Sequence, residues 1–112
     1  VASAKLDRPA EAINSFNRAI AANQNYYRPY LFRGMLHLKR GNLEIAQQDL
    51  SASNRLLPTA DATFGLGDIA QRQGDTQTAL RYYQAVANSR SSLAPAARER
   101  IARLESGITT TP

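Results

Sequence analysis

Residues 30–58, YLFRGMLHLKRGNLEIAQQDLSASNRLLP, decide the fold of this chain. Apolar and small side chains recur in the first half of the stretch at the helical period of about 3.6 residues: Tyr30, Leu31, Gly34, Met35 and Leu38. Gly41 and Asn42 interrupt the pattern, with Asn42 as the expected N-cap of a second helix, and Pro58 ends that helix. The stretch therefore predicts two helices, over 27–40 and 43–56, joined by a tight turn.

The same unit recurs along the chain at a spacing of 33 to 34 residues, which is typical of helical repeat arrays. Four landmarks share this spacing. They are the turn residues Asp7, Gly41 and Gly74, the small residues Ala12, Ala46 and Ala79, the large residues Phe16, Leu50 and Tyr83, and the helix glycines Gly34 and Gly67. The repeat predicts further helices over 9–22, 60–73, 76–88 and 95–105, and a truncated helix over residues 1–6.

The two glycines inside helices, Gly34 and Gly67, indicate close packing between paired helices. A glycine in a helix interior costs about 1 kcal/mol relative to alanine, so its presence needs a compensating contact. Without a Cβ atom, the paired helix can approach closely, and we expect the alanines at positions 12, 46 and 79 to be the small facing residues.

The pattern resembles the tetratricopeptide repeat, whose signature is W-x2-L-G-x2-Y…A-x3-F…P over 34 residues. Six positions of 27–58 match it: Tyr30, Gly34, His37, Ala46, Leu50 and Pro58. Four positions of 60–89 match it: Leu66, Gly67, Ala79 and Tyr83. Arg33 stands where leucine is usual and Thr63 where an aromatic residue is usual, so both should weaken packing. The resemblance implies an all-α, right-handed superhelix of antiparallel helix pairs, about 2.5 repeats long, with a C-terminal capping helix.

The expected organisation is one array over residues 1–106. It comprises a partial repeat (1–24), two repeats (27–58 and 60–89) and a capping helix (93–106), which Ser106 and Gly107 should end. Residues 107–112 should form a flexible tail. Because the sequence starts inside a repeat, we interpret it as a fragment of a larger protein.

No catalytic, metal-binding or cofactor motif stands out in the sequence. There is no cysteine and only one histidine, His37, so a thiolate site is excluded and a histidine cluster cannot form. His37 lies where the tetratricopeptide family has tyrosine, and we expect it to be packed rather than catalytic. Gly65 and Gly67 form a G-x-G without a third glycine, and Asp61 and Asp68 are interpreted as surface charges. We therefore expect no enzyme activity from this stretch and no cofactor.

The charge balance is basic, with 14 Lys and Arg residues against 9 Asp and Glu residues, a formal charge of +5. Because the basic residues are scattered, and those of the last helix alternate with glutamates, a solvated surface is favoured over a nucleic-acid site. No apolar run approaches the roughly 20 residues of a membrane span. The composition leaves the compartment open between cytoplasm and periplasm.

The resemblance implies that the first helix of each pair lines a concave groove where a protein or peptide partner binds. The implied groove residues are Arg28, Leu31, Met35, Leu38, Lys39, Asp61, Phe64, Asp68, Gln71, Arg72 and Arg98. Leu31, Met35, Leu38 and Phe64 have two interpretations, a partner-binding surface or the core between repeats. Leu31 and Met35 also occupy the places of the Lys/Asn clamp with which some family members hold a C-terminal carboxylate, which argues against that mode.

Two further hypotheses concern the role of the chain in a larger enzyme and its self-association. Residues 49–60 and 64–75 are loosely similar to the C-terminal repeat regions of bacterial envelope zinc metallopeptidases, so the chain can be the accessory region of an enzyme whose catalytic domain lies upstream. That similarity favours the bacterial envelope. An incomplete first repeat would also leave an open end face, through which copies of the fragment could associate.

Overall fold

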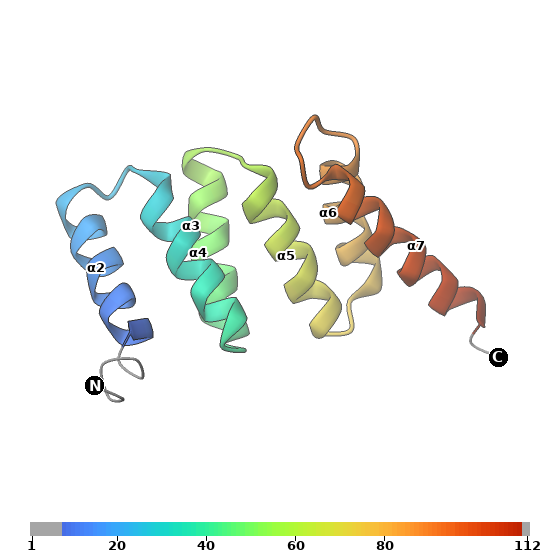
Figure 1. The fold of residues 1–112 in the computed structure, drawn as a ribbon, viewed down its shortest axis with the longest axis horizontal. Coiled ribbons are helices and arrows are strands. Elements are labelled where there is room, and N and C mark those ends of the chain that lie inside the picture. Colours follow the sequence, from blue (N-terminus) through green and yellow to red (C-terminus); the bar gives the residue numbers. More distant parts are fainter. Residues whose placement is uncertain (1–7, 111–112) are drawn as a thin grey trace. The chain divides into compact units, whose positions relative to one another are not determined.

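A computed structural model describes the backbone of residues 8–110 and the side chains of residues 8–107. Six helices are present in this part of the chain: α2 (Arg8–Ala22), α3 (Tyr27–Lys39), α4 (Leu43–Leu56), α5 (Ala60–Arg72), α6 (Thr76–Ala87) and α7 (Ala94–Thr110) (Figure 1). They fall into two compact units, Val1–Leu57 and Pro58–Pro112. The all-α class and the helix pairs are confirmed. The helix expected over residues 1–6 lies outside the described residues.

The turns inside the two helix pairs are built identically. Gly41 after α3 and Gly74 after α5 have positive φ values of 85° and 81°, which only glycine adopts without steric cost. The next backbone N–H closes each turn, from Asn42 to the carbonyl of His37 and from Asp75 to that of Ala70, both at 2.9 Å. The predicted turns at these glycines are therefore confirmed.

The second helices of the pairs begin differently. Asp75 caps α6, because its Oδ1 accepts a hydrogen bond from the backbone N–H of Thr78 at 3.2 Å. Hydrogen bonds from the Thr78 side chain and backbone hold the pKa of Asp75 below its usual value. Asn42 stands at the corresponding position before α4, but its side chain makes no capping bond. Asn42 therefore occupies the predicted N-cap position, but its side-chain amide lies 3.3 Å from Nδ1 of His37 instead of capping the helix.

Gly34 and Gly67 confirm the predicted close approach between paired helices. A Cβ atom on Gly34 would lie 2.9 Å from Leu50 Cδ2, and one on Gly67 would lie 2.8 Å from Tyr83 Cε1. The nearest contacts of the glycines are therefore with the large residue of the paired helix. Ala46 and Ala79 are nonetheless fully buried. The missing Cβ makes room for a bulky side chain, which fills the pair's core.

Substituting Gly67 by alanine should destabilise unit Pro58–Pro112, although alanine is the better helix former. The added Cβ overlaps the Tyr83 ring, and overpacking of about 1–3 kcal/mol outweighs the roughly 1 kcal/mol gained in helix propensity. Gly107→Ala in α7 is the matched control, since no neighbouring side chain lies within 4 Å of the position that its new methyl group would occupy. In urea denaturation, Gly67→Ala should lower the free energy of unfolding and Gly107→Ala should raise it. A higher free energy of unfolding for Gly67→Ala would contradict the packing of Gly67 against Tyr83.

The last helix is longer than expected. α7 runs from Ala94 to Thr110, so it continues past the end predicted at Ser106 and Gly107. The reason is conformational: Gly107 does not adopt the positive φ that ends α3 and α5. Residues 111 and 112 lie outside the described part. Near its start, α7 packs Ala97, Ile101 and Leu104 against the core formed with Tyr83.

Candidate functional site

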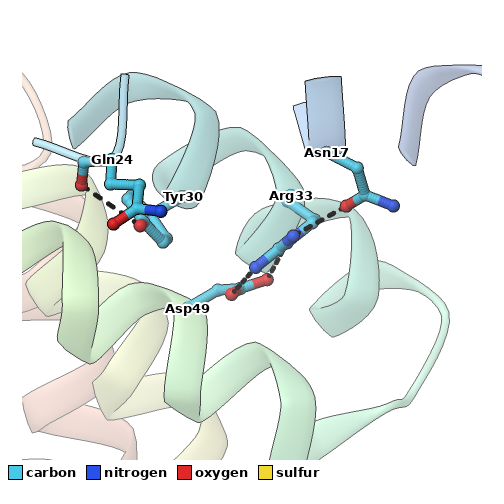
Figure 2. A network of polar contacts seen from close by, with 5 residues as sticks. All are labelled: Asn17, Gln24, Tyr30, Arg33 and Asp49. Atoms are coloured by element: carbon cyan, nitrogen blue, oxygen red, sulfur yellow. Dashed lines mark hydrogen bonds and ion pairs between the residues drawn. The ribbon is translucent and has the colours of Figure 1, made fainter. Parts of the chain in front are cut away.

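A partly buried ion pair joins the two helices of the first pair. Arg33 on α3 donates from Nε and Nη2 to the two carboxylate oxygens of Asp49 on α4, at 2.8 and 2.7 Å. Its Nη1 donates to Asn17 Oδ1 on α2 at 2.7 Å (Figure 2). Arg33 therefore bridges three helices, and the expectation that it weakens packing was wrong.

Burial makes this pair structurally significant. The Asp49 side chain is only 6% exposed and that of Arg33 is 23% exposed. The hydrogen bond with Asp49 raises the pKa of Arg33 above its ordinary value. Tyr30 completes the network: its ring lies 5.9 Å from the Arg33 guanidinium carbon, and its hydroxyl donates to the Gln24 carbonyl at 3.2 Å (Figure 2). The sequence contained a signal for this ion pair. Arg33 and Asp49 directly precede Gly34 and Leu50, which pack against each other, so the two charged residues also lie on neighbouring positions of the paired helices.

The predicted groove residues on α3 separate into buried and exposed sets. Leu31 is 4% exposed and Leu38 is 9% exposed, so both are core side chains. Met35 is 43% exposed, and Arg28 and Lys39 are also exposed. Of the five residues, only these three present a surface that a partner can contact. The role of that surface stays a prediction.

Phe32 is an exposed residue that the sequence interpretation omitted. Its side chain is 46% exposed, and its ring stacks on that of Phe16 from α2 with centroids 6.1 Å apart. Phe32 lies four residues after Arg28, three before Met35 and seven before Lys39. This spacing places all four on one side of α3. We call Arg28, Phe32, Met35 and Lys39 the α3 stripe.

In the second unit, a polar cluster joins α5, α6 and α7. The Tyr83 hydroxyl lies 2.5 Å from Asp68 Oδ1 and 2.9 Å from Gln71 Oε1, and Arg100 on α7 pairs with Asp68. Burial, followed by the hydrogen bond and charge of Asp68, raises the pKa of the Tyr83 hydroxyl. The interpretation of Asp68 as a surface charge was wrong, since its side chain is 20% exposed and engaged in this cluster.

Arg100 links this cluster to the aromatic residues beneath it. Its guanidinium carbon lies 4.9 Å from the centroid of the Phe64 ring, which in turn lies 5.4 Å from the Tyr83 ring. Burial lowers the pKa of Arg100, but the Asp68 charge and Tyr83 outweigh it and raise the pKa overall. Phe64 is therefore half-buried between an arginine and a tyrosine. Arg100, interpreted from sequence as part of a solvated face, is a packing residue.

The remaining predicted residues of this unit lie around the cluster. Gln71 and Arg72, together with Asp68 and Arg100, line an open hollow of about 330 Å³. Arg98 does not line this hollow; its Nη1 donates to the carbonyl of Ala87, at the end of α6, at 3.2 Å. Asp61 is exposed on the first turn of α5. The structure thus brings Phe64, Asp68, Gln71 and Arg72 together, and Arg100 accompanies them from α7.

The described residues contain no group of three or more His, Asp or Glu side chains placed to hold a metal ion. His37 is 9% exposed and contacts Asn42, in agreement with the packed position predicted for it. Between residues 8 and 110, no helix is long and apolar enough to cross a membrane.

Comparison with known proteins agrees with this architecture. The family model for the tetratricopeptide repeat matches residues 2–53, 33–94 and 64–105. Anaphase-promoting complex subunit cut9 of Schizosaccharomyces pombe is 33% identical over 75 residues, which are 66% of this chain and 11% of that protein. TPR repeat-containing protein MJ1428 of Methanocaldococcus jannaschii is 30% identical over 79 residues, 70% of this chain and 14% of that protein. The chain thus spans a small part of each relative's length. With helix pairs, turn glycines and core positions all in place, the chain belongs to the tetratricopeptide repeat family.

Proposed function

We propose that this chain is a protein-interaction module that binds a peptide or a partner helix on the first helices of its pairs. The observation that carries the proposal is the exposure of Met35 at 43%, although Leu31 and Leu38, one helical turn away on either side of it along α3, are buried. A flexible thioether on an open surface suits an adaptable apolar contact. The relative named as a subunit of the anaphase-promoting complex belongs by that name to a multi-protein assembly, which supports the same kind of role.

The second unit contributes to the proposal through the hollow beside Asp68. Gln71 and Arg72 are exposed there, and they offer amide and guanidinium groups that can hydrogen-bond a peptide. Phe64 is less suited to direct binding, because its ring already contacts Tyr83 and Arg100. Each unit therefore has its own proposed contact residues. They are Arg28, Met35 and Lys39 on α3 of the first unit, and Gln71 and Arg72 on α5 of the second.

Met35→Glu should weaken partner binding at least about tenfold while leaving the fold intact, since a carboxylate on an exposed contact disrupts an apolar interface. Ile45→Glu is the matched control, because Ile45 on α4 is equally exposed at 46% and lies outside the proposed surface. Quantitative pull-down would identify proteins retained by wild type and Ile45→Glu but lost by Met35→Glu. Calorimetry with the purified partner would then measure the affinities, and equal values for both variants would refute the proposal.

The alternative roles stay separate proposals. The role of accessory repeat region in a larger enzyme would be supported by a peptidase domain encoded upstream of Val1. Nucleic-acid binding predicts a gel shift that weakens as salt rises. Self-association predicts a mass that grows with concentration in light scattering.

A further inference from the structure

The α3 stripe combines two large apolar side chains with a cation at each end. Phe32 and Met35 are 46% and 43% exposed, and Arg28 and Lys39 flank them along the helix. The four positions follow the spacing i, i+4, i+7 and i+11, so they fall within a narrow arc of the helix surface. Because Phe32 and Met35 are three residues apart on the helix, their exposed side chains are neighbours on its surface.

The charged residues of the sequence segment that contains the stripe all have one sign. Residues 12–43 contain no Asp or Glu, but they contain Arg18, Arg28, Arg33, Lys39 and Arg40. Arg33 is neutralised by Asp49. Within residues 8–110, neither Arg28 nor Lys39 forms an ion pair; the Arg28 Nε contacts only the Tyr27 hydroxyl, at 3.4 Å. The cations at the ends of the stripe are therefore available to carboxylates of another molecule.

We propose that the α3 stripe docks a protein segment whose bulky apolar side chains are flanked by acidic residues. This inference rests on the proposed function and specifies the chemistry of the partner. The apolar centre would supply burial, worth roughly 25 cal/mol for each Å² removed from water. The basic ends would supply orientation and a faster association rate through complementary charge.

The length of the stripe limits the spacing of those acidic residues. Arg28 and Lys39 are eleven residues apart on α3, about 16 Å at 1.5 Å per residue. An extended segment covers that distance in about five residues, at 3.3 Å per residue. A single-stranded nucleic acid fits the stripe less well, because it uses successive aromatic platforms and the second apolar residue here is methionine.

The test uses synthetic peptides, acetylated and amidated so that they carry no terminal charge, and fluorescence anisotropy. The probe has Glu at both ends and Leu and Phe in the centre. One matched peptide has Lys at both ends, and another has Ser in place of the central Leu and Phe. At low salt, the Glu-ended apolar peptide should bind at least about tenfold more tightly than either matched peptide. Raising the salt should reduce its advantage over the Lys-ended peptide.

Two charge-reversal variants test whether the stripe is the site. Arg28→Glu/Lys39→Glu should reverse the preference between Glu-ended and Lys-ended peptides. Arg55→Glu/Arg81→Glu changes the net charge equally at exposed positions on α4 and α6, and it should leave that preference unchanged. The inference is overturned if both variants reverse the preference between Glu-ended and Lys-ended peptides equally. It is also overturned if the wild type binds all peptides with equal affinity or binds none of them. Tighter binding of a labelled single-stranded oligonucleotide, lost in Arg28→Glu/Lys39→Glu, would also overturn it.

These outcomes are distinguishable from a failure of the proposed function. If Met35→Glu abolishes binding of the natural partner while the peptides show no charge preference, the interaction module stands and the acidic-segment inference fails. If Met35→Glu and Arg28→Glu/Lys39→Glu both leave every binding reaction unchanged, α3 is not the interaction surface and both proposals fail.

Discussion

Tyr83→Ala should destabilise unit Pro58–Pro112 by about 3–5 kcal/mol, the usual range for removing a large buried aromatic side chain. Tyr83 is fully buried, its ring fills the space that Gly67 leaves open, and its hydroxyl joins Asp68 and Gln71. Alanine would leave a cavity beside Gly67 and would remove a partner of Asp68. Hydrogen exchange resolved by peptide should show the largest loss of protection in α5 and α6, because those helices pack on this ring.

Tyr83→Phe is the matched control, since it keeps the ring and removes only the hydroxyl. Asp68 remains paired with Arg100 in that variant, so the expected loss is about 1 kcal/mol, that of an ordinary hydrogen bond. Nearly equal losses for the two variants would show that the hydroxyl network, and not ring packing, holds this unit together. A small loss for Tyr83→Ala would contradict the packing of Gly67 against Tyr83.

Asp49→Ala should destabilise unit Val1–Leu57 by about 2–4 kcal/mol. The substitution leaves the partly buried Arg33 guanidinium without its carboxylate, and a buried charge that loses its partner costs several kcal/mol. The 23% exposure of Arg33 moderates this cost, because water can reach part of the guanidinium. The free energy of unfolding, measured by urea denaturation, is the relevant quantity.

The double variant Arg33→Leu/Asp49→Ala shows how much of the loss in Asp49→Ala comes from leaving the Arg33 guanidinium unpaired. Replacing both charges removes the unpaired guanidinium, so we expect recovery of most of the loss caused by Asp49→Ala alone. Glu99→Ala breaks the Arg103–Glu99 pair on α7, whose side chains are 70% and 64% exposed, and should change stability by less than about 0.5 kcal/mol. If Asp49→Ala and Glu99→Ala have equal effects, burial does not strengthen the Arg33–Asp49 pair.

The two polar clusters show why the sequence interpretation erred at individual residues. A pattern of apolar residues identifies which side of a helix is buried, but Arg33 and Arg100 lie at the edge of that side. Whether such an arginine faces water or a carboxylate depends on the neighbouring helix. Asp49 on α4 and Asp68 on α5 supply those carboxylates. Arg98, two residues from Arg100, pairs with no carboxylate among residues 8–107 and instead contacts the backbone at the end of α6.

The sequence by itself determined the helix pairs of this protein, because its apolar period and turn glycines are local features whose physics does not depend on distant residues. Gly41 and Gly74 set the turns through their positive φ, and Gly34 and Gly67 make room for Leu50 and Tyr83. Only the tertiary structure decided which side chains remain available to a partner. Leu31 and Leu38 became core, whereas Phe32 and Met35 stayed exposed between two cations. All four are apolar residues on one helix, and their burial depends on what packs against that helix, which their own spacing does not encode.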